Sequence, residues 1–160
     1  MVKILRVIHS LNPKVGGPPE GILQITPILK EYGIETAVIC LDHSESKWLN
    51  NKPYKVFALG EGFLKYGFQF RLISKIESIA SNFDLIIIHG LWQYHSLATF
   101  FALRKLKKKY FIFTHGMLDP WFAKKYPLKH LKKKIYWNLF EKKVIKGSEA
   151  VFFTSKNEEI

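Results

Sequence analysis

Two histidines occupy positions where their side chains could do chemistry. His89 and His115 each end an apolar run and are each followed by glycine, in "DLIIIHG" (84–90) and "YFIFTHG" (110–116). An imidazole titrates near neutral pH and can donate a hydrogen bond to a hydroxyl or phosphate oxygen. Glycine after it allows the chain to turn sharply. If the two runs are neighbouring strands, both rings face one cleft; the alternative is that each histidine is a satisfied structural residue.

A glycine-rich loop, "NPKVGGPPEG" (12–21), is the second feature. Gly16 and Gly17 provide backbone that a ligand can approach closely. The helix predicted after them offers unpaired N–H groups and a partial positive charge, which suit a phosphate or carboxylate. The spacing matches neither a dinucleotide fingerprint nor a Walker loop. The alternative is a tight strand-to-helix connection in which proline starts the helix.

Aromatic and acidic residues follow the histidines. Trp92 and Trp121 come shortly after them, and their rings suit stacking on a sugar or a base, although for Trp121 packing over the sheet is favoured. Asp119 could orient His115, accept a hydrogen bond from a substrate hydroxyl, or cap its own loop. Neither cysteine nor a second nearby histidine completes a zinc ligand set, so no metal is expected.

The elements that position these residues alternate along the chain. Strands are predicted at 4–10, 35–41, 55–59, 84–88, 110–114 and 150–155, and helices at about 19–32, 68–81, 96–108 and 128–146. This alternation, with continuous apolar strands, predicts an α/β fold: a Rossmann-like, three-layer α/β/α domain with a mostly parallel sheet. Ligands of such sheets bind at the carboxyl ends of the strands, where the histidines and the glycine loop lie.

Helical periodicity predicts which side chains face the sheet. For the first helix these are Ile22, Ile25, Ile28 and Leu29, and for the second Phe70, Ile73, Ile76, Ile79 and Ala80. The length of 160 residues and a hydrophobic content of 48% fit one soluble domain covering residues 1–160. Cys40 is the single cysteine and lies in an apolar run, so it is predicted to fill the core of a cytoplasmic protein.

The net charge of +12 comes mainly from the second part of the chain, because fifteen of the 25 Lys and Arg residues follow residue 100. Residues 124–146 form a basic amphipathic pattern with an apolar stripe at Leu128, Leu131, Ile135 and Leu139. The lysines Lys129, Lys132, Lys133 and Lys134 are predicted to face an anionic membrane surface. An ordinary helix with a solvated lysine face is the alternative. Nucleic acid is less favoured because arginine, which recognises phosphate and bases better, is scarce there.

Four segments, taken in order, resemble a known family. "VIHSLNPKVGGPPEGI", "IIIHGLW", "THGMLDPW" before the lysine-rich helix, and "VFFTSKNEE" are similar to the amino-terminal domain of GT-B retaining glycosyltransferases. The likeness is greatest to the family 4 (GT4) group that builds bacterial exopolysaccharide and lipopolysaccharide, and it covers essentially the whole sequence. The resemblance implies two Rossmann-like domains, the first binding mainly the acceptor and the second mainly the nucleotide-sugar donor.

The resemblance also implies roles for residues. His115 would face the transferred sugar and act in catalysis. Substrate or phosphate would be bound by Gly16, Gly17, His89, Trp92, Asp119 and Glu158. The lysine-rich helix would approach the membrane that holds a lipid-linked acceptor, so the protein would be peripheral at the inner face of the plasma membrane. No metal or other cofactor is expected beyond the nucleotide-sugar.

The family's donor-binding residues belong to a second domain that these 160 residues lack. The chain ends just after a helix begins at Ser155, which favours a truncated chain or half of a split enzyme. The sequence therefore predicts the acceptor half of a glycosyltransferase that acts on a lipid- or saccharide-linked hydroxyl, inactive alone and completed by a donor domain in cis or in trans. The alternative is a non-catalytic basic α/β module that binds nucleic acid or scaffolds a partner chain; binding to nucleic acid would weaken steeply with salt.

Overall fold

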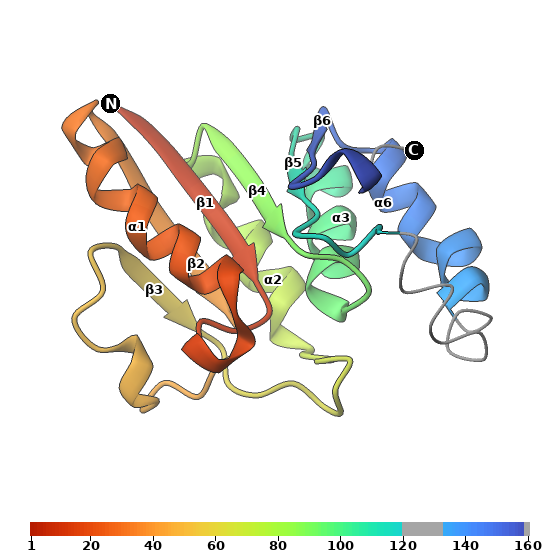
Figure 1. The fold of residues 1–160 in the computed structure, drawn as a ribbon, viewed down its shortest axis with the longest axis horizontal. Coiled ribbons are helices and arrows are strands. Elements are labelled where there is room, and N and C mark those ends of the chain that lie inside the picture. The colour runs from red at the N-terminus through yellow and green to blue at the C-terminus, as the bar shows by residue number, and fades with distance from the viewer. Residues whose placement is uncertain (120–132, 159–160) are drawn as a thin grey trace.

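A six-stranded sheet organises the chain, and every pair of neighbouring strands is parallel (Figure 1). The computed structural model describes residues 1–119 and 133–158. The strands are β1 (Val2–Ile8), β2 (Ile34–Cys40), β3 (Lys55–Ala58), β4 (Leu85–His89), β5 (Phe111–Phe113) and β6 (Ala150–Phe152), in the order β3-β2-β1-β4-β5-β6. The predicted Rossmann-like fold is confirmed. The strand order reverses between β1 and β4, the switch point beside which α/β sheets bind ligands.

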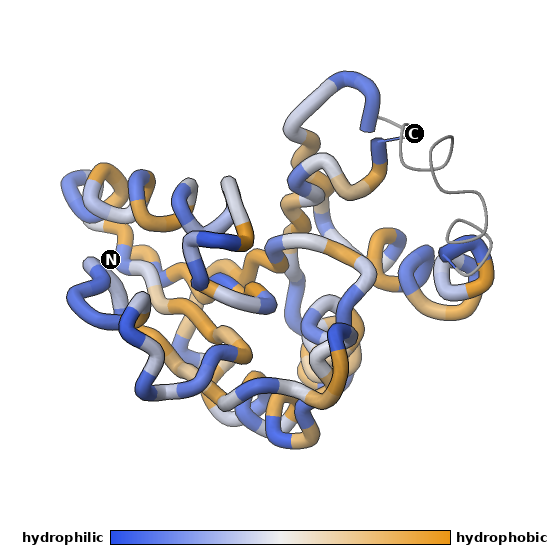
Figure 2. Tube along the Cα trace, turned by 60° about the horizontal axis from the view of Figure 1, so that its bottom comes forward, coloured by the Kyte–Doolittle hydropathy of each residue, from blue (hydrophilic) through white to orange (hydrophobic). Residues whose placement is uncertain are grey.

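Helices cover both faces of the sheet. On one face lies α1 (Gly17–Glu31), which packs Ile22 against Ile8, Val38 and Cys40. On the other lie α2 (Arg71–Ile79), α3 (Tyr94–Leu106) and α6 (Lys142–Lys146), over a larger apolar cluster. Figure 2 shows these hydrophobic strands inside and hydrophilic stretches in the outer loops. The buried Cys40 fills the core as predicted, and burial raises the pKa of its thiol.

Short turns and one irregular helix complete the described elements. The 3-10 turns are η1 (Pro13–Val15), η2 (Lys47–Leu49), η3 (Ala80–Asn82) and η5 (Lys156–Glu158). The predicted basic helix of 128–146 is helical from 133 to 146, with a π-helical segment, η4 (Trp137–Glu141), before α6. Its beginning lies outside the described residues. No helix in the described parts of the chain combines the length and apolarity needed to cross a bilayer.

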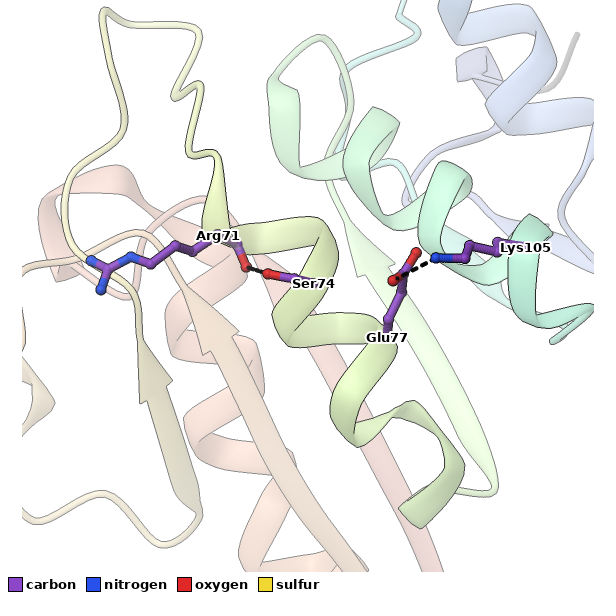
Figure 3. Close-up of polar contacts among 4 residues, drawn as sticks. All are labelled: Arg71, Ser74, Glu77 and Lys105. Atoms are coloured by element: carbon purple, nitrogen blue, oxygen red, sulfur yellow. Dashed lines mark hydrogen bonds and ion pairs between the residues drawn. The ribbon is translucent and has the colours of Figure 1, made fainter.

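Local sequence explains where α1 begins and ends, and polar contacts are formed along α2. Proline occupies the first turn of α1, where its missing N–H costs no helical bond. The helix ends before Gly33, whose φ of 72° allows the chain to leave the helix. In α2 the Ser74 hydroxyl donates to the Arg71 carbonyl at 3.0 Å, and Glu77 pairs with Lys105 of α3 at 3.1 Å (Figure 3).

The predicted buried faces of the first two helices are only partly correct. Ile22 is buried, but Ile25 and Ile28 are 38% and 50% exposed, because no described helix lies beside α1 over β5 and β6. Phe70 is 74% exposed because α2 begins only at the next residue, so Phe70 precedes the helix. Ile76 and Ala80 are buried as predicted, and Leu72, which was not predicted, is buried with them.

Candidate functional site

His89 and His115 meet at the carboxyl edge of the sheet. Nδ1 of His89 lies 2.9 Å from Nε2 of His115, and the two rings stack with their centroids 5.1 Å apart. On the other side of His89, Nη1 of Arg6 lies 3.0 Å from its Nε2. The three side chains come from β1, the end of β4 and the residues after β5. We call Arg6, His89 and His115 the histidine array.

Arg6 determines where the protons of both rings reside. A guanidinium has donors only, so Nε2 of His89 must accept and Nδ1 must carry the proton. That Nδ1–H donates to Nε2 of His115, whose own proton is then on Nδ1. A proton added at Nε2 of His115 would set two N–H groups against each other. His115 is therefore held as a neutral imidazole that donates only through Nδ1.

Burial and charge both oppose protonation of the two rings. Burial lowers the pKa of His89 well below its usual value, and the Arg6 charge lowers it further. The pKa of His115 is lowered by burial and by Arg6, while Glu158 partly offsets this. Both rings are therefore harder to protonate than free imidazoles. Because both nitrogens of His89 are bonded to protein groups, this residue positions His115 and has no free nitrogen for the predicted substrate contact.

The backbone around the array adopts uncommon conformations. His115 and Trp92 have φ angles of 53° and 69°, in the left-handed region that non-glycine residues rarely occupy. Gly90 and Gly116 beside them also have positive φ. The buried His95 of α3 lies with Nε2 2.8 Å from the carbonyl oxygen of His89 and so supports the turn. Such strain concentrates at functional sites.

Trp92 is held by protein contacts. Its indole Nε1 donates to the carbonyl of Met117 at 3.0 Å, and its ring packs against that of Trp137. The ammonium group of Lys133 lies 4.8 Å from the centre of the same ring. These contacts compete with the predicted stacking of Trp92 on a substrate. Lys133, which we expected to face a membrane, contacts this ring.

Glu141, which the sequence did not single out, lies behind the Trp92 loop. Its fully buried Oε1 accepts from the N–H of Trp92 at 3.2 Å and contacts the hydroxyl of Ser96 at 3.0 Å. Burial raises its pKa to about 7, although hydrogen bonds from Trp92, Ser96 and Tyr136 act in the opposite direction. Glu141 belongs to the π-helical segment η4, an irregularity that recurs at functional sites.

Glu158 fastens the loop that carries His115. Its buried carboxylate accepts from the N–H of Thr154 at 2.9 Å, from the Thr154 hydroxyl at 2.8 Å and from the N–H of Leu118. Burial alone would raise its pKa, but these bonds and one from Thr114 lower it to about 2. Glu158 thus connects the residues after β6 to the His115 loop, a structural role in place of the predicted substrate contact. Asp119 lies in the same loop, and its N–H donates to the Gly116 carbonyl.

The glycine loop is exposed, as its predicted role requires. Gly16 has φ 107° and ψ −144°, a conformation suited to glycine, and a Cβ added at Gly16 or Gly17 would meet no atom within 4 Å. No side chain caps α1 at Gly16, but Pro18 and Pro19 have no N–H and the Gly16 N–H donates to the Pro13 carbonyl, so among residues 16–19 the Gly17 N–H is the backbone donor left for a ligand. The buried Asp42 supports the residues before the loop, because its carboxylate accepts from the Ser10 hydroxyl and the Leu11 N–H.

A cavity of about 210 Å³ adjoins the histidine array, and we call it the Arg6 cavity. It is lined by Arg6, Pro18, Gly21, Ile22, Ile25, His89, Phe113 and His115. The first turns of α1 and both histidines therefore share one concavity, but Gly16 and Gly17, which we expected in the same cleft, do not line it. A larger cavity of about 630 Å³ lies at the opposite edge of the sheet, by Lys3 and Phe83, away from these groups.

Some predicted site residues lie outside the described structure, namely Trp121, Lys129 and Lys132. Within residues 1–119 and 133–158, no three potential metal ligands gather. Arg6 was missed although a signal existed: it is a charged residue inside the apolar run "ILRVI", which a buried strand tolerates only with partners. Nothing in the sequence alone pairs Glu141 with Trp92, since 49 residues separate them.

Solved structures share the fold. MurG from Acinetobacter baumannii is 12% identical, with a TM-score of 0.60 over 97% of this chain and 42% of that one. The UDP-GlcNAc 2-epimerase from Methanocaldococcus jannaschii is 15% identical, with a TM-score of 0.59 over 98% of this chain and 40% of that one. S. aureus MnaA, solved with UDP, is 12% identical, with a TM-score of 0.61 over 99% of this chain and 40% of that one. The chain thus spans about two fifths of these proteins.

The family comparison covers most of the site, although Arg6 lies before the matched residues. No sequence among the curated proteins matches significantly. The family description that matches is Glycosyltransferase Family 4, over residues 15–159, which include the glycine loop, both histidines and Glu158. Since that match takes in nearly the entire chain, and the structural neighbours have the same fold, this chain belongs to Glycosyltransferase Family 4.

Proposed function

We propose that the chain is the acceptor-side domain of a glycosyltransferase that moves a sugar from a nucleotide-sugar to a lipid- or saccharide-linked hydroxyl. The observation that carries the proposal is the histidine array. In a member of Glycosyltransferase Family 4, it presents His115 as a fixed, neutral hydrogen-bond donor at the carboxyl edge of the sheet, in a concavity shared with the first turns of α1.

The described residues supply distinct parts of the reaction. The exposed backbone at Gly16 and Gly17 lies near the donor's diphosphate, where the Gly17 N–H and the positive end of the α1 dipole offset part of the charge of the leaving group. Nδ1–H of His115 donates to an oxygen of the sugar being transferred. The bond that breaks is at the sugar carbon, so this scheme requires neither a serine or cysteine nucleophile nor a metal ion.

Sugar transfer by the protein tests this proposal. Purified protein is incubated with a panel of radiolabelled nucleotide-sugars and with membrane extracts as the source of acceptor. We expect label to pass from one donor to a lipid or saccharide product. The 160 residues alone are expected to turn over no donor, because most of the donor-binding contacts are assigned to a second domain in cis or in trans. Transfer by these residues alone would contradict that assignment, and no transfer by any form of the protein would contradict the proposed function.

A membrane-facing surface is the second part of the proposal. In the helix of 133–146, Ile135 and Leu139 are 55% and 52% exposed, and they lie one helical turn apart. Lys134 and Lys142 are exposed nearby. Apolar side chains flanked by lysines are typical of helices that lie at an anionic bilayer surface. This surface would bring the acceptor edge close to a lipid-linked substrate.

Binding to liposomes tests the membrane surface. Lys134→Ala is expected to weaken binding to vesicles that contain anionic lipid roughly fivefold, since each basic residue near such a surface contributes about 1 kcal/mol. Leu139→Ser removes an exposed apolar side chain and should weaken binding further. Lys30→Ala changes an exposed lysine of α1 and serves as the control. Equal pelleting of all variants would contradict the proposal, and RNA binding that depends on Lys134 would favour the nucleic-acid module.

A further inference from the structure

Arg6 is a buried cation without an anionic partner among the described residues. The residue lies in the middle of β1 and is only 6% exposed. Its one hydrogen bond to another side chain joins Nη1 to the neutral His89, and its buried Nε has no partner. No Asp or Glu in residues 1–119 and 133–158 lies within ion-pair distance of its guanidinium.

An unpaired buried charge is costly, and the other buried charged groups avoid that cost. The carboxylate of Asp42 accepts hydrogen bonds from Ser10, Leu11 and Trp48. Glu158 likewise has several donors, and the raised pKa of Glu141 favours its neutral form. The Arg6 guanidinium cannot become neutral as the Glu141 carboxyl does, because arginine stays protonated in proteins. Arg6 therefore requires an anion from outside the described residues.

The Arg6 cavity provides space for that anion. Its volume of about 210 Å³ equals that of roughly seven waters in the liquid, enough for a phosphate or carboxylate group with some hydration. Pro18 and Gly21 place the first turns of α1 at the same wall. The positive end of a 15-residue helix adds to the attraction for a negative charge.

We propose that the Arg6 cavity is a binding site for a single oxoanion, either a phosphate or a carboxylate group, with the Arg6 guanidinium as its counter-ion. This subsite is separate from the glycine loop, because neither Gly16 nor Gly17 lines the cavity. It goes beyond the proposed sugar transfer and does not depend on it. An anion here also holds Arg6 in place and so steadies the hydrogen bond that positions His89.

Inorganic phosphate is the probe, compared with sodium chloride at equal ionic strength. The Nε–H resonance of Arg6 in wild-type protein is expected to shift with added phosphate and to saturate. Arg6→Met should weaken phosphate binding at least tenfold, and Arg6→Lys, which keeps the charge, should weaken it less. Arg71→Met is the matched control: Arg71 is exposed, its guanidinium donates to the Leu59 carbonyl, and it lies on α2 (Figure 3).

Two further ligands distinguish the sources of the oxoanion. UDP presents phosphate on a nucleotide, and glucuronate presents a carboxylate on a sugar; the one that shifts the Arg6 resonance at the lower concentration identifies the source. The proposal fails if none of the three ligands shifts that resonance, or if the shifts are confined to Gly16 and Gly17. It also fails if folded Arg6→Met binds phosphate as tightly as wild type. These outcomes leave the sugar-transfer proposal untouched, because no step of the assay requires turnover.

Discussion

Replacing His115 by alanine is expected to lower the rate of sugar transfer roughly 10²- to 10³-fold, the usual effect of removing one donor that stabilises charge in a transition state. The substitution removes the Nδ1–H that the histidine array holds toward the sugar. His115→Asn is the matched variant, because its side-chain amide N–H lies near the position of Nδ1–H. Asparagine also tolerates the φ of 53° at this position. We expect it to restore most of the lost rate.

Initial rates at saturating donor measure this prediction, and circular dichroism checks the fold of each variant. Because the His89 N–H occupies Nε2 of His115 and the pKa of His115 is lowered by burial, we expect its titration to produce no step in the rate at pH 7 and above. A full rate in His115→Ala would contradict the assigned role. So would an Asn variant as slow as the Ala variant, since then the imidazole would be doing more than donating through Nδ1.

Glu141 is expected to give stability an unusual pH dependence. Its pKa is about 7 in the folded protein against an ordinary value of 4.5, because the carboxyl is buried. The folded state then holds a proton that the unfolded state releases, so stability is lost as the pH rises from 4.5 through 7. Between pH 4.5 and pH 8 this loss amounts to about 3 kcal/mol in the free energy of unfolding, at 1.36 kcal/mol for each pKa unit.

Glu141→Gln isolates that contribution, because glutamine has the shape and the donor of a protonated carboxyl. The amide oxygen of glutamine can still accept from the Trp92 N–H and the Ser96 hydroxyl, as Oε1 of Glu141 does. We expect the wild type to lose about 3 kcal/mol relative to the variant from pH 4.5 to pH 8, measured by urea unfolding. A constant difference across this range would contradict a carboxyl that is protonated in the fold.

The sheet could be predicted from the sequence because its strands are short, continuous apolar runs separated by helices. Parallel strands place their carboxyl ends at one edge, so the meeting of His89 and His115 followed from their positions after "DLIII" and "YFIFT". The openness of Gly16 and Gly17 followed from the same reasoning. Each of these inferences needed only local sequence and one rule of topology.

What could not be predicted depends on register and on contacts between distant segments. That Arg6 lies on the same face as His89 follows from the pairing of Ile8 with His89, which sequence does not specify. The burial of Glu158 under the His115 loop, and of Glu141 under Trp92, requires the final packing of residues some 40 positions apart. For the same reason the sequence did not show that Glu158 and Trp92, which we expected to bind substrate, form hydrogen bonds within the protein.

The tautomers of the histidines test the central claim most directly. Two-bond ¹H–¹⁵N correlation spectra of the labelled protein at pH 7 report which ring nitrogen carries the proton. The histidine array predicts that His89 and His115 are both neutral, each with the proton on Nδ1 and a bare Nε2, and that His95 has the opposite tautomer. A proton on Nε2 of His115, or a charged imidazolium there, would contradict the account.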